Sequence, residues 1–205
     1  MKKTRFYSTG LRLSMARITF AATILISSFC SAEWEALPIP NPSFEEGDRL
    51  PNSWRTYQDG DAGLLFIWSR EFARTGNRSL YIKNEGPRHG AWECQSRLSF
   101  EPGATYRASV WYCARLEKLY AKGKGSGRLA LLIFGPRQTL DGKDHRWDAA
   151  KGADFSATDN EWKLLTFEFT PPPEVKSAVI WLWSLLGAGN ELWFDDFSLE
   201  IKRKE

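Results

Sequence analysis

The sequence predicts an all-β fold, a two-sheet antiparallel β-sandwich of the jelly-roll type. Short runs rich in β-branched and aromatic residues recur along the chain, and Gly, Pro, Asn or Asp bounds each of them, as is typical of strands joined by turns. No window of about twelve residues repeats its apolar side chains with the period of an amphipathic helix. Many short strands separated by turn signals favour a sandwich or jelly roll.

The runs expected to form strands can be taken in chain order. They span residues 64–69, 79–83, 92–100, 106–114, 128–134, 162–169, 177–186 and 191–201. The run ending at Phe169 is followed by three prolines, Pro171 to Pro173, which a helix would not accept. Residues 137–159 are long, polar and contain Trp147, so we expect a loop there. Long loops in compact domains are often functional.

Residues 1–32 have the three features of a secretory signal peptide. Basic residues come first, residues 18–29 are apolar, and Cys30, Ser31 and Ala32 supply small residues at a cleavage point. The apolar stretch is shorter than the roughly 20 residues that span a bilayer, so we expect cleavage after Ala32 and no membrane span afterwards. An uncleaved membrane anchor is the alternative. The protein is therefore expected to be secreted or periplasmic.

Removal of this segment changes the charge balance. The whole chain has 28 basic and 25 acidic residues, a net charge of +3, but five of the basic residues lie in residues 1–32. The 23 that remain are outnumbered by the acidic residues, so no nucleic-acid partner is expected. The rest of the chain divides into an extended lead-in over 33–40, the sandwich over 41–201 and a basic tail over 202–205.

Two cysteines remain after residue 32, Cys94 and Cys113. Export permits a disulfide, and Cys94 lies eight residues before Pro102 while Cys113 lies ten residues after Gly103, so a simple hairpin would place them nearly opposite one another. Strand alternation instead assigns them to different faces. A possible disulfide and two free thiols therefore both stand as alternatives.

Four segments of the chain resemble carbohydrate-binding modules of families four, nine and twenty-two, within the galactose-binding-like jelly rolls. The first is NPSFEEG at residues 41–47 with LPNSW at 50–54, the second ARTGNRSL at 73–80, the third LSFEPGATYRASVW at 98–111 and the fourth LWFDDFSL at 192–199. The resemblance implies a β-sandwich, frequently a structural calcium ion, and a ligand face on the concave sheet or at the loops. Such modules are commonly attached to secreted glycoside hydrolases, and the chain departs from that habit because no catalytic domain accompanies it.

The resemblance brings together the candidate calcium ligands Glu45, Gly76 and Asp195. Ca²⁺ takes six to eight oxygen ligands from carboxylates and backbone carbonyls. Glu45 and Asp195 would provide side-chain oxygens and Gly76 a carbonyl. The alternative is a hydrogen-bonded carboxylate cluster that ties the start of the sandwich to its last strand.

A surplus of tryptophan, ten in all, indicates a sugar-binding platform. Pyranose rings present apolar faces that stack on flat aromatic rings, and nearby polar groups bind their hydroxyls. We expect Trp111, Trp181 and Trp183 to contact ligand from the sheet, Trp68 and Trp147 from loops or edges, and Gln95, Arg97 and Arg107 to supply polar contacts. The alternative is that most of these tryptophans belong to the core.

The sequence contains no nucleophile elbow, zinc-protease motif or phosphate-binding loop. The predicted function is therefore that of a non-catalytic protein that binds a polysaccharide or oligosaccharide, with a separate glycoside hydrolase as a further partner. A structural or adhesion sandwich that contacts protein is the first alternative. A small hydrolase acting on glycosyl bonds, or a polysaccharide lyase, is the second.

Overall fold

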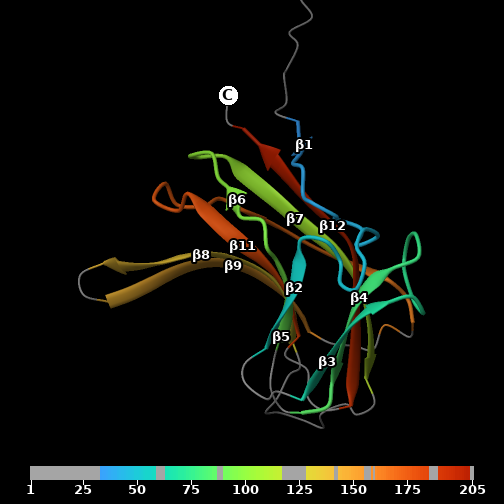
Figure 1. The fold of residues 1–205 in the computed structure, drawn as a ribbon. Coiled ribbons are helices and arrows are strands. Elements are labelled where there is room, and N and C mark those ends of the chain that lie inside the picture. Colours follow the sequence, from blue (N-terminus) through green and yellow to red (C-terminus); the bar gives the residue numbers. More distant parts are fainter. Residues whose placement is uncertain are drawn as a thin grey trace, which may run out of the picture. The chain divides into compact units, whose positions relative to one another are not determined.

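The computed structural model describes residues 33–58, 63–86, 90–116, 128–140, 143–154, 158, 160–184 and 189–203. The predicted signal peptide over residues 1–32 lies outside this part of the chain. All regular elements among the described residues are strands, which pair antiparallel into two sheets, so the predicted fold class is confirmed (Figure 1). The described segments contain no helix that is long and apolar enough to cross a membrane.

The two sheets are named here after their central strands. The β12 sheet has the order β10–β7–β12–β4–β3, with β1 paired to β12, and the β11 sheet has the order β2–β5–β11–β8–β9, with β6 paired to β11. The β12 sheet is made of β1 (Glu35–Ala36), β3 (Leu64–Ser69), β4 (Ser79–Asn84), β7 (Thr105–Leu116), β10 (Lys163–Phe169) and β12 (Asn190–Lys202). The β11 sheet is made of β2 (Trp54–Gln58), β5 (Gly90–Cys94), β6 (Leu98–Ser99), β8 (Arg128–Leu140), β9 (Lys143–Asp154) and β11 (Ser177–Ser184).

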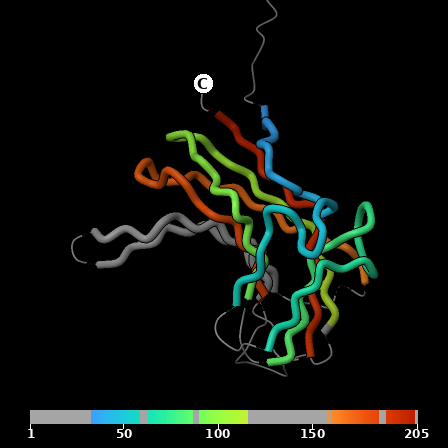
Figure 2. Tube along the Cα trace, in the orientation of Figure 1, coloured from blue at the N-terminus to red at the C-terminus, as the bar shows by residue number. Residues whose placement is uncertain are grey.

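The lead-in and the end of the chain lie side by side. Glu35 pairs with Ile201 and Ala36 with Glu200, so β1 extends the β12 sheet next to its last strand (Figure 2). The backbone N–H of Leu37 also donates to the carbonyl of Leu199, at 2.8 Å. The expected extended lead-in is thus partly a strand of the sheet.

The prediction of a loop over residues 137–159 is wrong. β8 continues through the first part of this segment and β9 pairs with it antiparallel. Backbone hydrogen bonds hold such a strand pair whatever the side chains are, whereas the prediction relied on apolar alternation. The register shifts between Phe134 and Arg137, where Pro136 has no N–H to donate to the ladder.

Two further differences concern short strands. The predicted run over residues 92–100 is divided into β5 and β6, and β2 was not predicted. After Trp54, the side chains of β2 are all exposed, so the strand lacks the buried alternate positions that reveal a strand in a sequence.

One apolar core lies between the two sheets. The β12 sheet contributes Leu80 and Phe194, and the β11 sheet contributes Trp92 and Ile180, all with no exposed surface. The indole of Trp92 also reaches across the core, because its Nε1 donates to the carbonyl of Tyr81 at 3.3 Å. Burying each large apolar side chain stabilises a fold by about 1.5–3 kcal/mol, so the contact between the sheets is the main source of stability.

The two cysteines are free, which decides between the alternatives left open by the sequence. Cys94 packs into the core from β5, whereas Cys113 in β7 belongs to a separate cluster with Tyr81 and Trp193 on the other side of the β12 sheet. Burial raises the pKa of both thiols, so they stay protonated at neutral pH. The alternative of two free thiols is therefore the one the structure has, because the two side chains lie in different sheets and point to different surroundings.

Candidate ligand-binding face

The side of the β11 sheet that faces away from the core carries a row of aromatic and charged side chains. On β11, Ile180 and Leu182 point into the core, so Trp181 and Trp183 point to the opposite side. The register places Glu93 of β5 opposite Trp181 and Arg55 of β2 opposite Glu93. These side chains, together with Tyr57 on β2, are called here the aromatic face, which consists of Arg55, Tyr57, Glu93, Trp181 and Trp183.

Glu93 is the charged centre of the aromatic face. Its Oε2 accepts a hydrogen bond from Nε1 of Trp181 at 2.9 Å, and its Oε1 accepts hydrogen bonds from Nε and NH2 of Arg55 at 3.1 and 2.5 Å. The Glu93 side chain is only 9% exposed, while that of Arg55 is 58% exposed. The carboxylate therefore fixes the edge of the indole, and the guanidinium remains accessible to a ligand.

The aromatic rings of this face lie close together. The ring centroids of Tyr57 and Trp181 are 4.3 Å apart with an angle of 33° between the planes. Trp183 packs with Trp181 and Val179 in a cluster of half-buried side chains. Tyr57 is 38% exposed, so part of its ring is accessible to a ligand. The result is an open aromatic surface bordered by a guanidinium.

This arrangement suits ligands with apolar faces and many hydroxyl groups. Flat rings offer stacking surfaces to the C–H faces of a sugar, and Arg55 offers N–H donors to hydroxyl oxygens. The indole of Trp181 is held by a hydrogen bond at one edge and by a ring contact with Tyr57, so little rotamer entropy remains to be lost on binding.

The structure separates Trp111 and Arg107 from Trp181 and Trp183. Both lie on β7 in the β12 sheet, not on the β11 sheet that carries Trp181 and Trp183. The guanidinium of Arg74 lies 3.9 Å above the Trp111 ring. Arg107 binds both carboxylate oxygens of Glu200, at 2.6 and 2.8 Å. Arg107 is therefore paired within the β12 sheet, and Trp111 is covered by a side chain from the turn between β3 and β4.

Trp68 is largely a core residue. It is 8% exposed, and its Nε1 donates to the carbonyl of Phe44 at 2.6 Å. Gln95 and Arg97 are exposed in the segment between β5 and β6. Trp147 lies in β9, and its side chain is outside the part that the structure describes.

Sequence reasoning missed Arg55, Tyr57 and Glu93. A signal for Glu93 was present, because it alternates with Trp92 and Cys94, which both face the core. Arg55 and Tyr57 alternate with Trp54 in the same way, but β2 had not been predicted. The pairing of three strands that are distant in sequence creates the face, and no single segment reveals it.

The predicted calcium residues surround a tight turn between β3 and β4. The carboxylate of Glu45 accepts hydrogen bonds from the backbone N–H groups of Asn77 and Arg78, at 3.0 and 2.8 Å. Asp195 Oδ2 accepts them from Arg74 and Thr75, at 2.7 and 3.2 Å. The turn thus joins the start of the sandwich to β12 through two carboxylates.

In this structure the candidate calcium ligands are engaged with backbone N–H groups. The oxygens of Glu45 and Asp195 face N–H donors, and the described residues contain no group of three or more His, Cys, Asp or Glu side chains that could share an ion. At Gly76, with φ +58°, a Cβ atom would lie 2.5 Å from the Glu45 carboxylate carbon. The geometry corresponds to the hydrogen-bonded cluster that was the alternative, and calcium stays a prediction.

Asp195 is fully buried in this cluster. Burial raises the pKa of its carboxyl to about 7, with a smaller contribution in the same direction from the charge of Asp196, while the N–H donors of Arg74 and Thr75 act in the opposite sense. The main chain at Asp196 has φ +46°, and the register of β12 against β7 shifts just after Asp195. The adjacent aspartates therefore do not simply alternate across the sheet.

The sequence model of a family described as a carbohydrate binding domain matches residues 39–185. The match covers most of the chain, and the chain belongs to this family. The resemblance to carbohydrate-binding modules is thereby confirmed, and the match includes the first three of the four segments. Among curated proteins, none matches the chain.

Several solved structures are similar in fold. The CBM22-1 xylan-binding domain from Paenibacillus barcinonensis Xyn10C is 17% identical with a TM-score of 0.51, over 80% of this chain and 93% of that one. The Stig cyclase Fisc from Fischerella sp. TAU is 17% identical with a TM-score of 0.58, over 84% and 100%. The α-L-arabinofuranosidase MgGH51 is 16% identical with a TM-score of 0.53, over 83% of this chain and 27% of that one. At these identities the likeness shows the fold alone.

Proposed function

We propose that this protein binds a polysaccharide through the aromatic face and carries out no chemistry of its own. The observation that supports this most is the position of Trp181, which is held at its Nε1 by Glu93 and lies against the exposed ring of Tyr57. A pre-positioned aromatic surface with a charged border is what stacking on a sugar ring requires. Membership of a carbohydrate-binding family supports the same ligand class.

The ligand is proposed to be a chain of sugars rather than a single one. Tyr57 lies on β2 and Trp181 and Trp183 lie on β11, with β5 between these strands. Neighbouring strands are about 4.8 Å apart, so the face extends over roughly two strand spacings, comparable with more than one sugar ring. The match to a xylan-binding domain in fold is consistent with an extended ligand but does not name it.

Calorimetric titration of the purified protein against a panel of soluble neutral polysaccharides tests this function. Saturable binding to one glycan class, with a heat that is lost when Tyr57 and Trp181 are both replaced by alanine, would support the proposal. A folded protein that gives no heat with any glycan, and that forms a stable dimer in size-exclusion chromatography, would favour the alternative of a protein-contacting sandwich.

We also propose that the protein is exported and works next to a separately encoded glycoside hydrolase. The basic and apolar pattern of residues 1–32 supports export. The likeness to one part of an arabinofuranosidase chain is consistent with a fold that can accompany hydrolases. N-terminal sequencing of the protein from the extracytoplasmic fraction tests export, and a chain that still begins at Met1 or Met15 would contradict it.

A further inference from the structure

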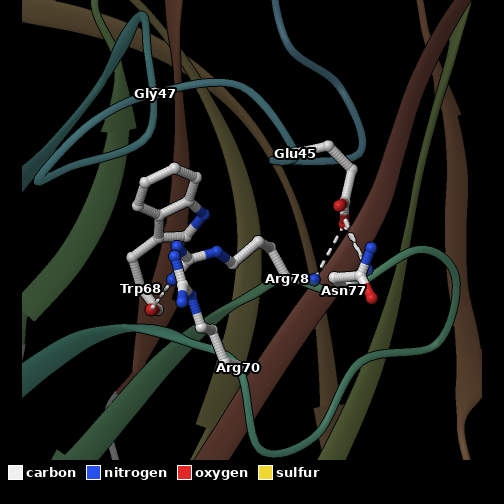
Figure 3. A pocket seen from close by; sticks show the side chains of 6 residues that line it. All are labelled: Glu45, Gly47, Trp68, Arg70, Asn77 and Arg78. Carbon is white, nitrogen blue, oxygen red and sulfur yellow. Dashed lines mark hydrogen bonds between the residues drawn. The ribbon is translucent and has the colours of Figure 1, made fainter.

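A pocket lies beside the β12 sheet, the sheet that does not carry the aromatic face. It has a volume of about 600 Å³ and lies beside the turn that joins β3 to β4 (Figure 3). Trp68 comes from β3, and the remaining side chains come from the segments on either side of the turn and from the start of the sandwich. The residues that line it are Glu45, Gly47, Trp68, Arg70, Asn77 and Arg78.

Two arginines, Arg70 and Arg78, line the pocket. Arg78 places its guanidinium carbon 4.0 Å above the ring of Trp68 and donates from NH1 to the Trp68 carbonyl at 3.1 Å. The side chain of Arg70 extends toward the same side of the indole (Figure 3). Stacking fixes the plane of the Arg78 guanidinium and leaves N–H donors at its edges.

The positive charge of this pair exceeds the charge of the one carboxylate that lines the pocket with it, that of Glu45. Neither Arg70 nor Arg78 forms an ion pair with a carboxylate among the described residues. Glu45 also lines the pocket, but its oxygens are directed at the backbone N–H groups of Asn77 and Arg78 (Figure 3). Desolvation lowers the pKa of Arg78, the nearby charge of Arg70 adds to this effect, and the charge of Glu45 acts in the opposite sense. Two guanidinium groups beside one carboxylate leave a net positive charge, which favours the binding of an anion.

We propose that this pocket binds the carboxylate of a uronic acid residue in an acidic polysaccharide. The inference rests on the proposed glycan-binding function and adds a site for a charged substituent. A guanidinium presents a planar fork of N–H donors that matches a carboxylate, and two such groups can hold both of its oxygens. Trp68 is 8% exposed and covered by Arg78, so the pocket recognises the charge rather than the face of the sugar ring.

A matched pair of ligands tests the site. A short oligogalacturonate and its methyl ester have the same sugar rings, but only the acid carries carboxylates. We expect the acid to bind at least about tenfold more tightly than the ester, with an affinity that falls as salt concentration rises. Arg70→Gln combined with Arg78→Gln is expected to remove this preference, and Arg70→Lys with Arg78→Lys to restore only part of it.

Controls separate the site from its surroundings and from the aromatic face. Lys202→Gln removes one exposed positive charge elsewhere and should leave the acid preference unchanged. Arg70→Gln alone changes an exposed position and should reduce the preference for the acid. It keeps the stacking of Arg78 on Trp68, which Arg78→Gln removes. The single variant therefore still tests the site if the double variant folds poorly. Tyr57→Ala with Trp181→Ala should abolish binding of a neutral polysaccharide and leave the acid preference in place.

Three results would overturn the inference. The first is equal binding of the acid and the ester by the wild-type protein. The second is an undiminished preference for the acid in folded Arg70→Gln and in the folded double variant Arg70→Gln with Arg78→Gln. The third is binding of polyglutamate that is as tight as binding of the oligogalacturonate. If neutral glycans bind and the acid is not preferred, the pocket assignment fails and the proposed function stands. If the acid binds and no neutral glycan does, the aromatic face fails and the pocket stands.

Discussion

Nε1 of Trp181 donates a hydrogen bond of 2.9 Å to Oε2 of Glu93, across the register that places these two residues opposite one another on β11 and β5. The same carboxylate accepts two hydrogen bonds from Arg55 through its other oxygen. One buried acidic group therefore orients both an indole and a guanidinium at the outer side of the β11 sheet. A charge that is hydrogen-bonded on both oxygens is stable at this position, whereas an unpaired one would not be.

Glu93→Ala is expected to weaken polysaccharide binding by about threefold to tenfold, because the indole of Trp181 loses its hydrogen-bond partner and its fixed orientation. Glu93→Gln keeps an oxygen that can accept from Nε1 and should have a smaller effect. Calorimetric titration of both variants measures the difference. Equal losses in the two variants would show that the orientation of Trp181 by Glu93 is not what matters for binding.

Tyr57→Phe should leave binding nearly unchanged, whereas Tyr57→Ala should weaken it by about tenfold. The ring of Tyr57 is 38% exposed and 4.3 Å from that of Trp181, so its contribution is aromatic surface rather than its hydroxyl group. The comparison is made with the same glycan for both variants. A strong loss in Tyr57→Phe would instead assign the role to the hydroxyl.

Gly76→Ala should lower the free energy of unfolding by about 2–3 kcal/mol. The position has φ +58°, which costs a residue with a Cβ atom about 1 kcal/mol, and the added Cβ would lie 2.5 Å from the Glu45 carboxylate carbon. Gly103→Ala is the matched control, because Gly103 has φ +77° with no atom within 4 Å of an added Cβ. Denaturant unfolding should show the larger loss at Gly76, and equal losses would mean that the contact with Glu45 is relieved without cost.

Removal of divalent cations should leave the thermal midpoint unchanged. The Glu45 and Asp195 carboxylates accept backbone hydrogen bonds from the turn at residues 74–78, so their oxygens have hydrogen-bond partners without an ion. Thermal unfolding with a chelator, and again with added calcium, measures this directly. A midpoint that falls with chelator and recovers with calcium would show that an ion binds here in place of some of these N–H donors, as the sequence resemblance implied.

The sequence predicted the fold class and most strand positions because buried alternate side chains mark them, as in β11, where Ile180 and Leu182 alternate with Trp181 and Trp183. It could not reveal β2 or β9, whose residues pair through the backbone without a clear apolar pattern. Those strands complete the β11 sheet on both sides.

The candidate site was predicted only in part. Trp181 and Trp183 were identified from alternation within one strand, and both lie on the aromatic face. Trp111 has the same local pattern on β7 but lies on the other sheet. The order of the strands decides which side chains share a sheet face, and a single sequence does not disclose that order. Glu93 looked like an ordinary acidic residue until its cross-strand neighbours were known.

The central claim is that the aromatic face binds the glycan. It is tested most directly by calorimetric titration with the glycan that the wild-type protein binds. The titration compares a double variant, Trp181→Ala with Trp183→Ala, with the single variant Trp111→Ala. If the aromatic face is the binding site, the double variant remains folded and loses detectable binding, while Trp111→Ala retains the wild-type affinity. Retained affinity in a folded double variant, or loss in Trp111→Ala alone, would contradict the assignment of binding to the β11 sheet.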